Sequence, residues 1–283
     1  MLRIALRIMT GLPVNLALAM GLAPACQHPP GRGHASRVAV RAGSYLLGSR
    51  PSERALGYAL SGPGVRQQGW YDAWEQEPHT VELGSFQIDR TPVTHRAYAD
   101  FVARTGHAPP DISPEDYARQ GFLVHPYREV EPYRWLAGAP PGDRLDDPVV
   151  LVSLRDAEAY CAWSGGRLPG EQEWEAACTG SEHRIFPWGD AWRAGTAQVE
   201  ADRTAPVTAH PEGGTPEGVL DLAGNVFEWT ASEFSPGRAA LRSCSWDDSP
   251  GACRCAFRHG RPADSRHILI GFRCAYGAAN EGR

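Results

Sequence analysis

The sequence lacks the motifs of several common enzyme and binding classes. It has no glycine-rich phosphate-binding loop, no serine-nucleophile elbow and no zincin helix, so the usual nucleotide-dependent, serine-hydrolase and zinc-peptidase mechanisms are without their residues. It also has no run of basic residues with interleaved aromatics, and its formal net charge is only −5. Nucleic-acid binding is therefore set aside as a function.

The residues that are present indicate a globular protein. The 283 residues are 42% hydrophobic and include nine Trp, which is enough for a sizeable core. We find no internal repeat, and no low-complexity tract apart from an N-terminal linker. The chain is long enough for one large domain or two small ones.

The N-terminus is typical of a secretory signal. Arg3 and Arg7 precede the apolar run "IMTGLPVNLALAMGL", and small residues follow it up to Ala25. The run is too short and too broken by Gly and Pro to predict a membrane-spanning helix. We therefore predict a signal over 1–25, a linker over 26–37, and export to the periplasm or cell envelope. Cys26 directly after the small residues resembles a lipoprotein box and predicts lipidation and a membrane anchor; ordinary cleavage near Ala25 is the alternative.

Six further cysteines remain for the exported part of the chain. An oxidising compartment and an even number favour disulfides, but six cysteines can be paired in 15 ways. Three of the six fall within "RSCSWDDSPGACRCAFR", residues 242–258. The spacing alone does not decide their pairing.

Hydrophobic periodicity predicts a mixed α/β domain that starts near residue 38. Alternation over 38–49 and again within 79–93 indicates strands. Helical spacing predicts helices after Thr94, after Ser153 and within 170–180, each ended by glycine. Residues 105–148 predict a long ordered loop region, and the chain beyond Gly180 predicts short segments without long helices.

Several phrases then resemble the formylglycine-generating enzyme, or sulfatase-modifying factor, family. They are "GSYLLGS", "FQIDRTPVTHRAYADF", "PVVLVSLRDAEAYCAWSGGRLPGEQEWEAA", "FPWGD", "GVLDLAGNVFEW" and "CRCAFRHGRPADSRHILIGFRCA". They occur in the family's order over about 38–277. The resemblance implies an α+β fold with much irregular structure, the formylglycine-generating-enzyme variant of the C-type-lectin fold. It also implies the disulfides Cys161–Cys274 and Cys178–Cys255.

The resemblance is weakest at the family's active cysteines. In the formylglycine generators two cysteines hold copper(I) and activate dioxygen. Here Ser245 and Trp246 match the preceding turn, but Asp248 stands in place of the first active cysteine and Cys244 in place of a glycine. Cys244 and Cys253 can then form a third disulfide, remain buried thiols, or act as functional thiols that bind copper(I).

The resemblance also implies a set of catalytic, groove and calcium-binding residues. The catalytic candidates are Ser245, Trp246, Cys244, Cys253, Arg258 and His259. The substrate-groove candidates are Trp229, Asp248 and Arg273. The calcium candidates are Glu228, Asn225, Gly224 and Val226, with Asp202 in a second site.

The histidines complete the set of candidates. His259 and His267 are the acid/base candidates by location. We expect His95 and His125 to be solvated, and no histidine pair has helical metal-ligand spacing.

These observations predict an exported oxidoreductase of this family that acts on a peptide or peptide-derived substrate. Because Asp248 is a poor copper(I) ligand, the standard two-cysteine mechanism is not expected. Two alternatives stay open: a non-catalytic peptide-binding module of the cell envelope, and a formylglycine generator with a relocated thiol pair.

Overall fold

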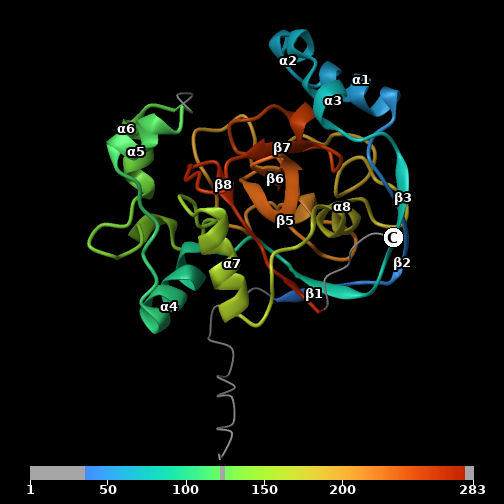
Figure 1. Cartoon of the computed structure of the whole chain (residues 1–283). Helices are drawn as coiled ribbons and strands as arrows, with labels where there is room; N and C mark the ends of the chain where they lie inside the picture. Colours follow the sequence, from blue (N-terminus) through green and yellow to red (C-terminus); the bar gives the residue numbers. More distant parts are fainter. Residues whose placement is uncertain (1–35, 122–124, 278–283) are drawn as a thin grey trace, which may run out of the picture. The chain divides into compact units, whose positions relative to one another are not determined.

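The computed structural model describes residues 36–121 and 125–277. All of them fall within one unit of the chain (Figure 1). The predicted signal segment and Cys26 lie outside the described residues, so export and lipidation stay predictions. Within the described ranges, no helix is both long enough and apolar enough to cross a membrane.

Two small sheets are formed largely by the N-terminal part of the domain. The alternating residues 38–49 form two strands rather than one. The first joins a sheet with order β1-β4-β9, and the second pairs antiparallel with β3, with Tyr45 opposite Val81. The bounds are β1 Arg37–Val40, β2 Gly43–Leu47, β3 His79–Leu83, β4 Phe86–Asp89 and β9 Ala275–Tyr276.

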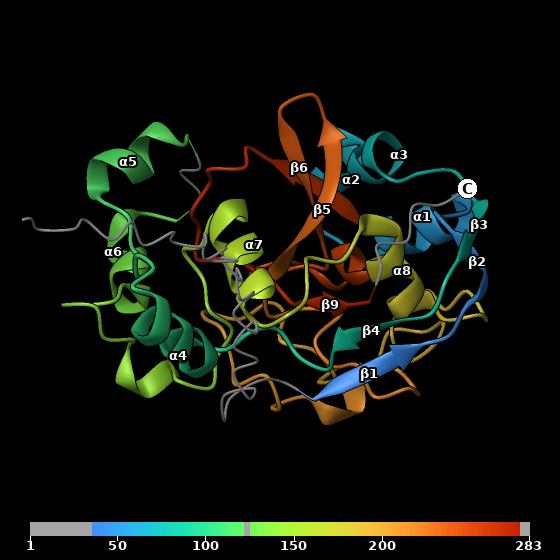
Figure 2. The ribbon, with the colours of Figure 1, turned by 60° about the horizontal axis from the view of Figure 1, so that its bottom comes forward.

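The third sheet lies at the centre of the domain, in the order β7-β6-β5-β8. Strands β5 and β6 form a hairpin, β7 pairs antiparallel with β6, and β8 runs parallel to β5. Figure 2 shows α7 and α8 on either side of this hairpin, with β1 and β4 below it. The bounds are β5 Phe227–Ser235, β6 Arg238–Arg242, β7 Arg258–Arg261 and β8 Ile270–Gly271.

Three helices lie where the sequence predicts them. Helix α4, His95–Thr105, is capped by the Thr94 hydroxyl and ends at a glycine with left-handed backbone. Helix α7, Leu154–Trp163, is capped by Ser153. Helix α8, Glu171–Thr179, has acidic residues in its first turn, where the helix dipole favours carboxylates.

Five short helices were not predicted. The bounds are α1 Pro51–Ala59, α2 Pro63–Gln68, α3 Trp70–Trp74, α5 Pro114–Arg119 and α6 Tyr127–Val130. Four 3-10 turns accompany them: η1 Glu131–Tyr133, η2 Gly142–Arg144, η3 Pro211–Gly213 and η4 Pro250–Cys253. Four of these helices have only four to six residues, too few turns for a periodic pattern, and the nine-residue α1 begins after Arg50 without a capping hydroxyl.

Disulfides tie the helices to the C-terminal segments. Cys161 of α7 bonds Cys274, and Cys178 of α8 bonds Cys255, as the resemblance implies. A third disulfide joins Cys244 to Cys253 across nine positions. All six sulfurs belong to residues that are at most 1% exposed, so the bridges are part of the core.

Candidate functional site

The loop after β6 places a serine hydroxyl between two carboxyl groups. Ser243 turns the chain with a φ of 72°, and the next residues curl back on themselves. The Ser245 Oγ lies 2.6 Å from Asp247 Oδ1 and 2.6 Å from Asp248 Oδ2, and the Ser245 N–H donates to Asp248 Oδ2 at 2.8 Å. A hydroxyl has one hydrogen, so both short contacts are satisfied together when one carboxyl carries a proton.

The two carboxyl groups differ in their affinity for that proton. Burial, followed by the charge of Asp247, raises the pKa of Asp248 to about 6. Burial also raises the pKa of Asp247, but hydrogen bonds from His125 and Ser245 outweigh it and hold that pKa below its usual value. Two neighbouring carboxyls whose pKa values are shifted in opposite directions are typical of acid/base sites. Asp248 is the group of this pair that exchanges a proton near neutral pH.

His125 keeps Asp247 ionised, and the expectation that this histidine is solvated is wrong. Its Nε2 lies 2.9 Å from Asp247 Oδ2, and its Nδ1 lies 2.8 Å from Glu129 Oε2. Hydrogen bonding to Asp247 is the main cause that raises the pKa of His125. With a carboxylate at each ring nitrogen, the imidazole is held as the cation.

The predicted acid/base histidines are instead neutral. His267 is buried against Tyr117, with 3.1 Å between its Nε2 and the phenol oxygen, and burial lowers its pKa to about 3. His259 packs on Trp74 with ring centroids 5.0 Å apart, and burial lowers its pKa to about 3 as well. His95, expected in solvent, is buried and accepts a hydrogen bond from an indole.

Three residues assigned to catalysis or to the groove are parts of the scaffold. The Arg258 guanidinium makes two hydrogen bonds to Glu171, at 2.6 and 2.7 Å. Arg273 is fully buried and bonds the Glu228 carboxylate twice, at 2.6 Å each. Trp229 is fully buried, and its indole N–H donates to the Val152 carbonyl. These three side chains therefore have partners within the protein, and a catalytic or groove role for them stays a prediction.

The residues assigned to calcium are likewise occupied by the protein. Glu228 accepts from the Trp174 indole in addition to Arg273. The Asn225 Oδ1 accepts from the Ala205 N–H, and its backbone carbonyl accepts from Trp246. The Gly224 carbonyl accepts from the Val226 N–H, and Asp202 is exposed. The side-chain oxygens of Glu228 and Asn225 therefore have partners within the protein, and calcium binding stays a prediction. Residues 36–121 and 125–277 contain no cluster of three or more His, Cys, Asp or Glu that could hold a metal ion.

The disulfide between Cys244 and Cys253 also removes the thiol pair that copper(I) would need. Both residues are completely buried, and the Cys244 sulfur accepts the Gly224 N–H. Copper(I) binds thiolates, and a disulfide offers none. The sequence left three alternatives open for Cys244 and Cys253: a disulfide, buried thiols or functional thiols. The structure contains the disulfide. Trp246 is buried beside it and contacts the His125 ring at 5.0 Å between centroids.

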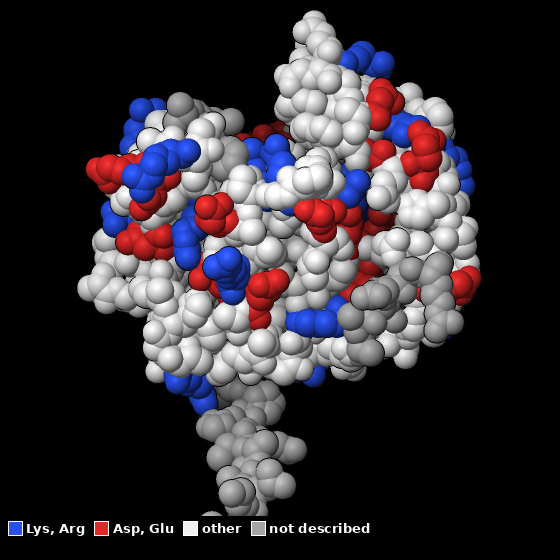
Figure 3. Space-filling model, viewed as in Figure 1, with Lys and Arg blue, Asp and Glu red and all other residues white. Residues whose placement is uncertain are grey.

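We call Ser245, Asp247, Asp248 and His125 the carboxyl cluster. The His125 ring lies 5.9 Å from the His267 ring, which stacks on Tyr117 of α5. Figure 3 shows a hollow between α5 and the α2–α3 region, and Figure 1 shows β7 there from the same side. Helix α5 and residues 262–266 line a pocket of about 490 Å³. His267 stacks on Tyr117 of α5, and His259 packs on Trp74 of α3. These two contacts connect α5 and α3 to β7 and the segment after it.

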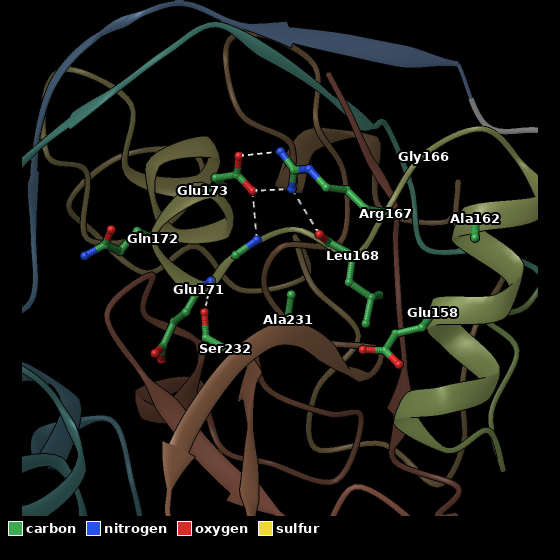
Figure 4. A pocket seen from close by; sticks show the side chains of 11 residues that line it. Glu158, Ala162, Gly166, Arg167, Leu168, Glu171, Gln172, Glu173, Ala231 and Ser232 are labelled. Atoms are coloured by element: carbon green, nitrogen blue, oxygen red, sulfur yellow. Dashed lines mark hydrogen bonds and ion pairs between the residues drawn. The ribbon is translucent and has the colours of Figure 1, made fainter. Parts of the chain in front are cut away.

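A separate pocket of about 390 Å³ lies between α7, α8 and β5 (Figure 4). Its charged groups mostly satisfy one another. Arg167 donates to both oxygens of Glu173, at 2.6 and 2.7 Å, and the Glu171 carboxylate is held by Arg258. With Arg167, Glu171 and Glu173 held in ion pairs, this pocket is the weaker candidate for chemistry.

Comparison with known proteins gives a consistent set of relatives. A profile of the family described as "Sulfatase-modifying factor enzyme 1-like domain" matches residues 27–278. The mouse protein named inactive C-alpha-formylglycine-generating enzyme 2 is 33% identical over 238 residues, which are 70% of this chain and 77% of that protein. Hercynine oxygenase of Mycolicibacterium smegmatis is 33% identical over 236 residues, 71% of this chain, and the match spans only 55% of that enzyme.

A solved structure has the same fold. The structure of PvdO from Pseudomonas aeruginosa aligns with a TM-score of 0.64 at 23% identity, covering 86% of this chain and 95% of PvdO. The expected fold class is confirmed: α+β, in the formylglycine-generating-enzyme variant of the C-type-lectin fold. At this identity the likeness concerns the fold and does not transfer an activity.

Proposed function

The chain belongs to the sulfatase-modifying factor enzyme 1-like domain family, and from this premise we propose that it oxidises a peptide or peptide-derived substrate without a two-cysteine copper centre. The family description names a factor that modifies another protein, and one relative is named an oxygenase. The first name supports a protein or peptide substrate, and the second supports oxidative chemistry. The observation that carries the proposal is the carboxyl cluster, which puts a titrating carboxyl at the position where the resemblance places an active cysteine.

The chemistry assigned to the cluster is proton transfer. Above pH 6 the ionised Asp248 accepts a proton from a substrate C–H or N–H group. His125 and Asp247 hold the surrounding charge in place. The substrate loses two electrons and two protons. One proton passes to Asp248, and the other passes with both electrons to dioxygen, which becomes the hydroperoxide anion and takes a proton from solvent to form hydrogen peroxide. Asp248 then releases its proton to water.

Oxygen uptake with peptide substrates tests this proposal. The purified mature protein is supplied with cysteine-containing and cysteine-free peptides in an oxygen electrode, with hydrogen peroxide measured in parallel. We expect uptake that falls by about 10²-fold or more in Asp248→Asn, the range typical of a lost acid/base group. The matched control is Asp143→Asn, because Asp143 is exposed and does not line the pocket beside α5.

Other outcomes favour the alternatives. Tight peptide binding with no oxygen uptake would support a binding module of the cell envelope. Uptake that needs added copper and a reductant, and that is lost in Cys244→Ser, would support a formylglycine generator whose thiol pair is released by reduction. Uptake that is unchanged in Asp248→Asn would overturn the role of the carboxyl cluster.

We also propose that the protein acts after export, on the basis of its N-terminal sequence. Cellular fractionation tests this: the mature chain is expected in the periplasm or with the membranes of the cell envelope. Loss of membrane association in Cys26→Ala would support lipidation. Intact mass that still includes residues 1–25 would contradict the predicted signal.

A further inference from the structure

The pocket between α7, α8 and β5 is lined by a carboxylate for which the fold supplies no partner. Its volume of about 390 Å³ falls within the range of small-molecule sites. Glu158, an exposed residue of α7, lines this pocket. Within residues 36–121 and 125–277, the Glu158 carboxylate forms no hydrogen bond or ion pair. Figure 4 shows this side chain reaching from α7 toward Leu168 and Ala231.

The other charged groups of the pocket are held by the protein. Arg167 donates to both oxygens of Glu173, at 2.6 and 2.7 Å, and to the Leu168 carbonyl at 3.1 Å. The Glu171 carboxylate accepts two hydrogen bonds from Arg258. A ligand that enters the pocket therefore meets neutralised ion pairs and one uncompensated negative charge. Because like charges repel and opposite charges attract, this charge favours a cation over an anion.

Apolar side chains lie next to the free carboxylate. Ala162 is four residues after Glu158 on α7, so the two side chains share one face of the helix. Leu168, which precedes α8, and Ala231, in β5, complete the apolar lining. The short alanine side chains leave space beside Leu168 for a slender group. The pocket thus presents a negative charge at one side of an apolar surface.

We propose that this pocket binds a primary ammonium group on an unbranched alkyl chain, with the ammonium at Glu158 and the methylenes against Leu168 and the two alanines. A compact ammonium at the end of a flexible apolar stem matches a carboxylate beside an apolar surface. The ammonium can belong to a lysine side chain of a peptide or to a free alkylamine, which the experiment separates. This inference goes beyond the proposed function, because the pocket is separate from the carboxyl cluster.

Titration of the isotope-labelled mature protein, followed by the NMR signals of its backbone amides, tests the site with defined probes. The probes are n-pentylamine and its neutral counterpart n-pentanol. We expect n-pentylamine to bind at least about threefold more tightly than n-pentanol, because a carboxylate that stays partly hydrated forms a modest ion pair. Added salt should reduce this preference, and the shifted signals should belong to residues that line the pocket.

Two variants separate the charge from the apolar surface. Glu158→Gln should remove the preference for the amine while leaving binding of n-pentanol unchanged. Ala162→Leu should weaken binding of both probes, because the larger side chain fills the pocket; the position is exposed on a helix, where leucine is well tolerated. The matched control is Glu182→Gln, an exposed glutamate that does not line the pocket, and it should keep the preference.

A third probe identifies the source of the ammonium. If Nα-acetyllysine amide binds as tightly as n-pentylamine, the pocket accepts a lysine side chain of a peptide; if it binds more weakly, the ligand is a free alkylamine. Equal binding of n-pentylamine and n-pentanol by the wild type overturns the inference. So does an amine preference that persists in Glu158→Gln, or a set of shifted signals that lies away from the pocket.

The result is independent of the proposed oxidation. Asp248→Asn should leave the preference for n-pentylamine unchanged, because Asp248 does not line this pocket. An amine preference that is lost in Glu158→Gln, with no oxygen uptake by the wild type, would retain the ammonium site and reject the oxidoreductase. Oxygen uptake that depends on Asp248, with no amine preference in the wild type, would do the opposite.

Discussion

The sequence contains no lysine, so the side chains that form ion pairs with carboxylates are arginines and histidines. The planar fork of arginine suits the two-bond pairs seen between Arg273 and Glu228 and between Arg258 and Glu171. Within the described residues, the carboxyl groups of Asp221 and Asp248 form no ion pair with an arginine. Burial raises the pKa of Asp221 to about 7 and, together with the charge of Asp247, that of Asp248 to about 6.

Asp221 should therefore make the protein less stable as the pH rises. Its folded pKa, raised mainly by burial, lies above the unfolded value of about 3.9, so the unfolded chain loses this proton first. Stability from this group is lost between about pH 4 and pH 7. We expect Asp221→Asn to match the wild type near pH 4 and to be more stable by about 1–3 kcal/mol at pH 8. Urea unfolding at both pH values measures this, and a less stable variant at pH 8 would contradict it.

His125 should give the opposite dependence. Its folded pKa is raised, so its contribution is complete below the unfolded pKa of about 6.5 and is lost as the pH rises through the folded value. We expect His125→Gln to be less stable by about 1–2 kcal/mol at pH 5.5, with a smaller difference at high pH. The measurement is urea unfolding of both proteins across this range. A difference that does not vary with pH would mean that the histidine acts only by packing.

The elements that could be predicted from the sequence are those with local signals. Helices α4, α7 and α8 each have nine or more residues, and two of them have a capping hydroxyl that the sequence shows. The carboxyl cluster has no such signal, because His125 and Asp247 are 122 positions apart. Its charged histidine follows from tertiary contacts alone. The disulfides Cys161–Cys274 and Cys178–Cys255 were predicted correctly because the resemblance to the family implied them.

Helix α1 shows how an unpredicted element is held by close packing. A Cβ at Gly251 of η4 would lie 2.1 Å from the Gly57 carbonyl oxygen of α1, which is backbone and cannot turn aside. We expect Gly251→Ala to lower the free energy of unfolding by about 2–3 kcal/mol, as overpacking does. Gly64→Ala on α2 is the control, because nothing lies near its Cβ, and it should be neutral or stabilising by up to about 1 kcal/mol. Chemical denaturation of both variants decides, and equal stability would contradict the close contact.

At the scale of the whole molecule, two of the three disulfides join segments that are far apart in the sequence, and the third closes a short loop. Cys161–Cys274 and Cys178–Cys255 close 113 and 77 positions, whereas Cys244–Cys253 closes nine. A crosslink that closes a long loop removes more freedom from the unfolded chain than one that closes a short loop. The two disulfides that close long loops also link α7 and α8 to segments that follow the central hairpin. They therefore hold the central sheet between the two helices.

Replacing each pair by serine should therefore rank the bridges by loop length. We expect losses of about 5 kcal/mol for Cys161–Cys274, about 4.5 for Cys178–Cys255 and about 2.5 for Cys244–Cys253. Guanidinium unfolding of the three double variants gives the order, after alkylation without reductant and mass spectrometry have established that the wild type has no free thiol among these six. If removing the short bridge were the most damaging change, Cys244 and Cys253 would contribute through the buried packing of the carboxyl-cluster loop rather than through the unfolded chain. The oxygen-uptake assay on that variant would then show whether the same packing sets the position of Asp248.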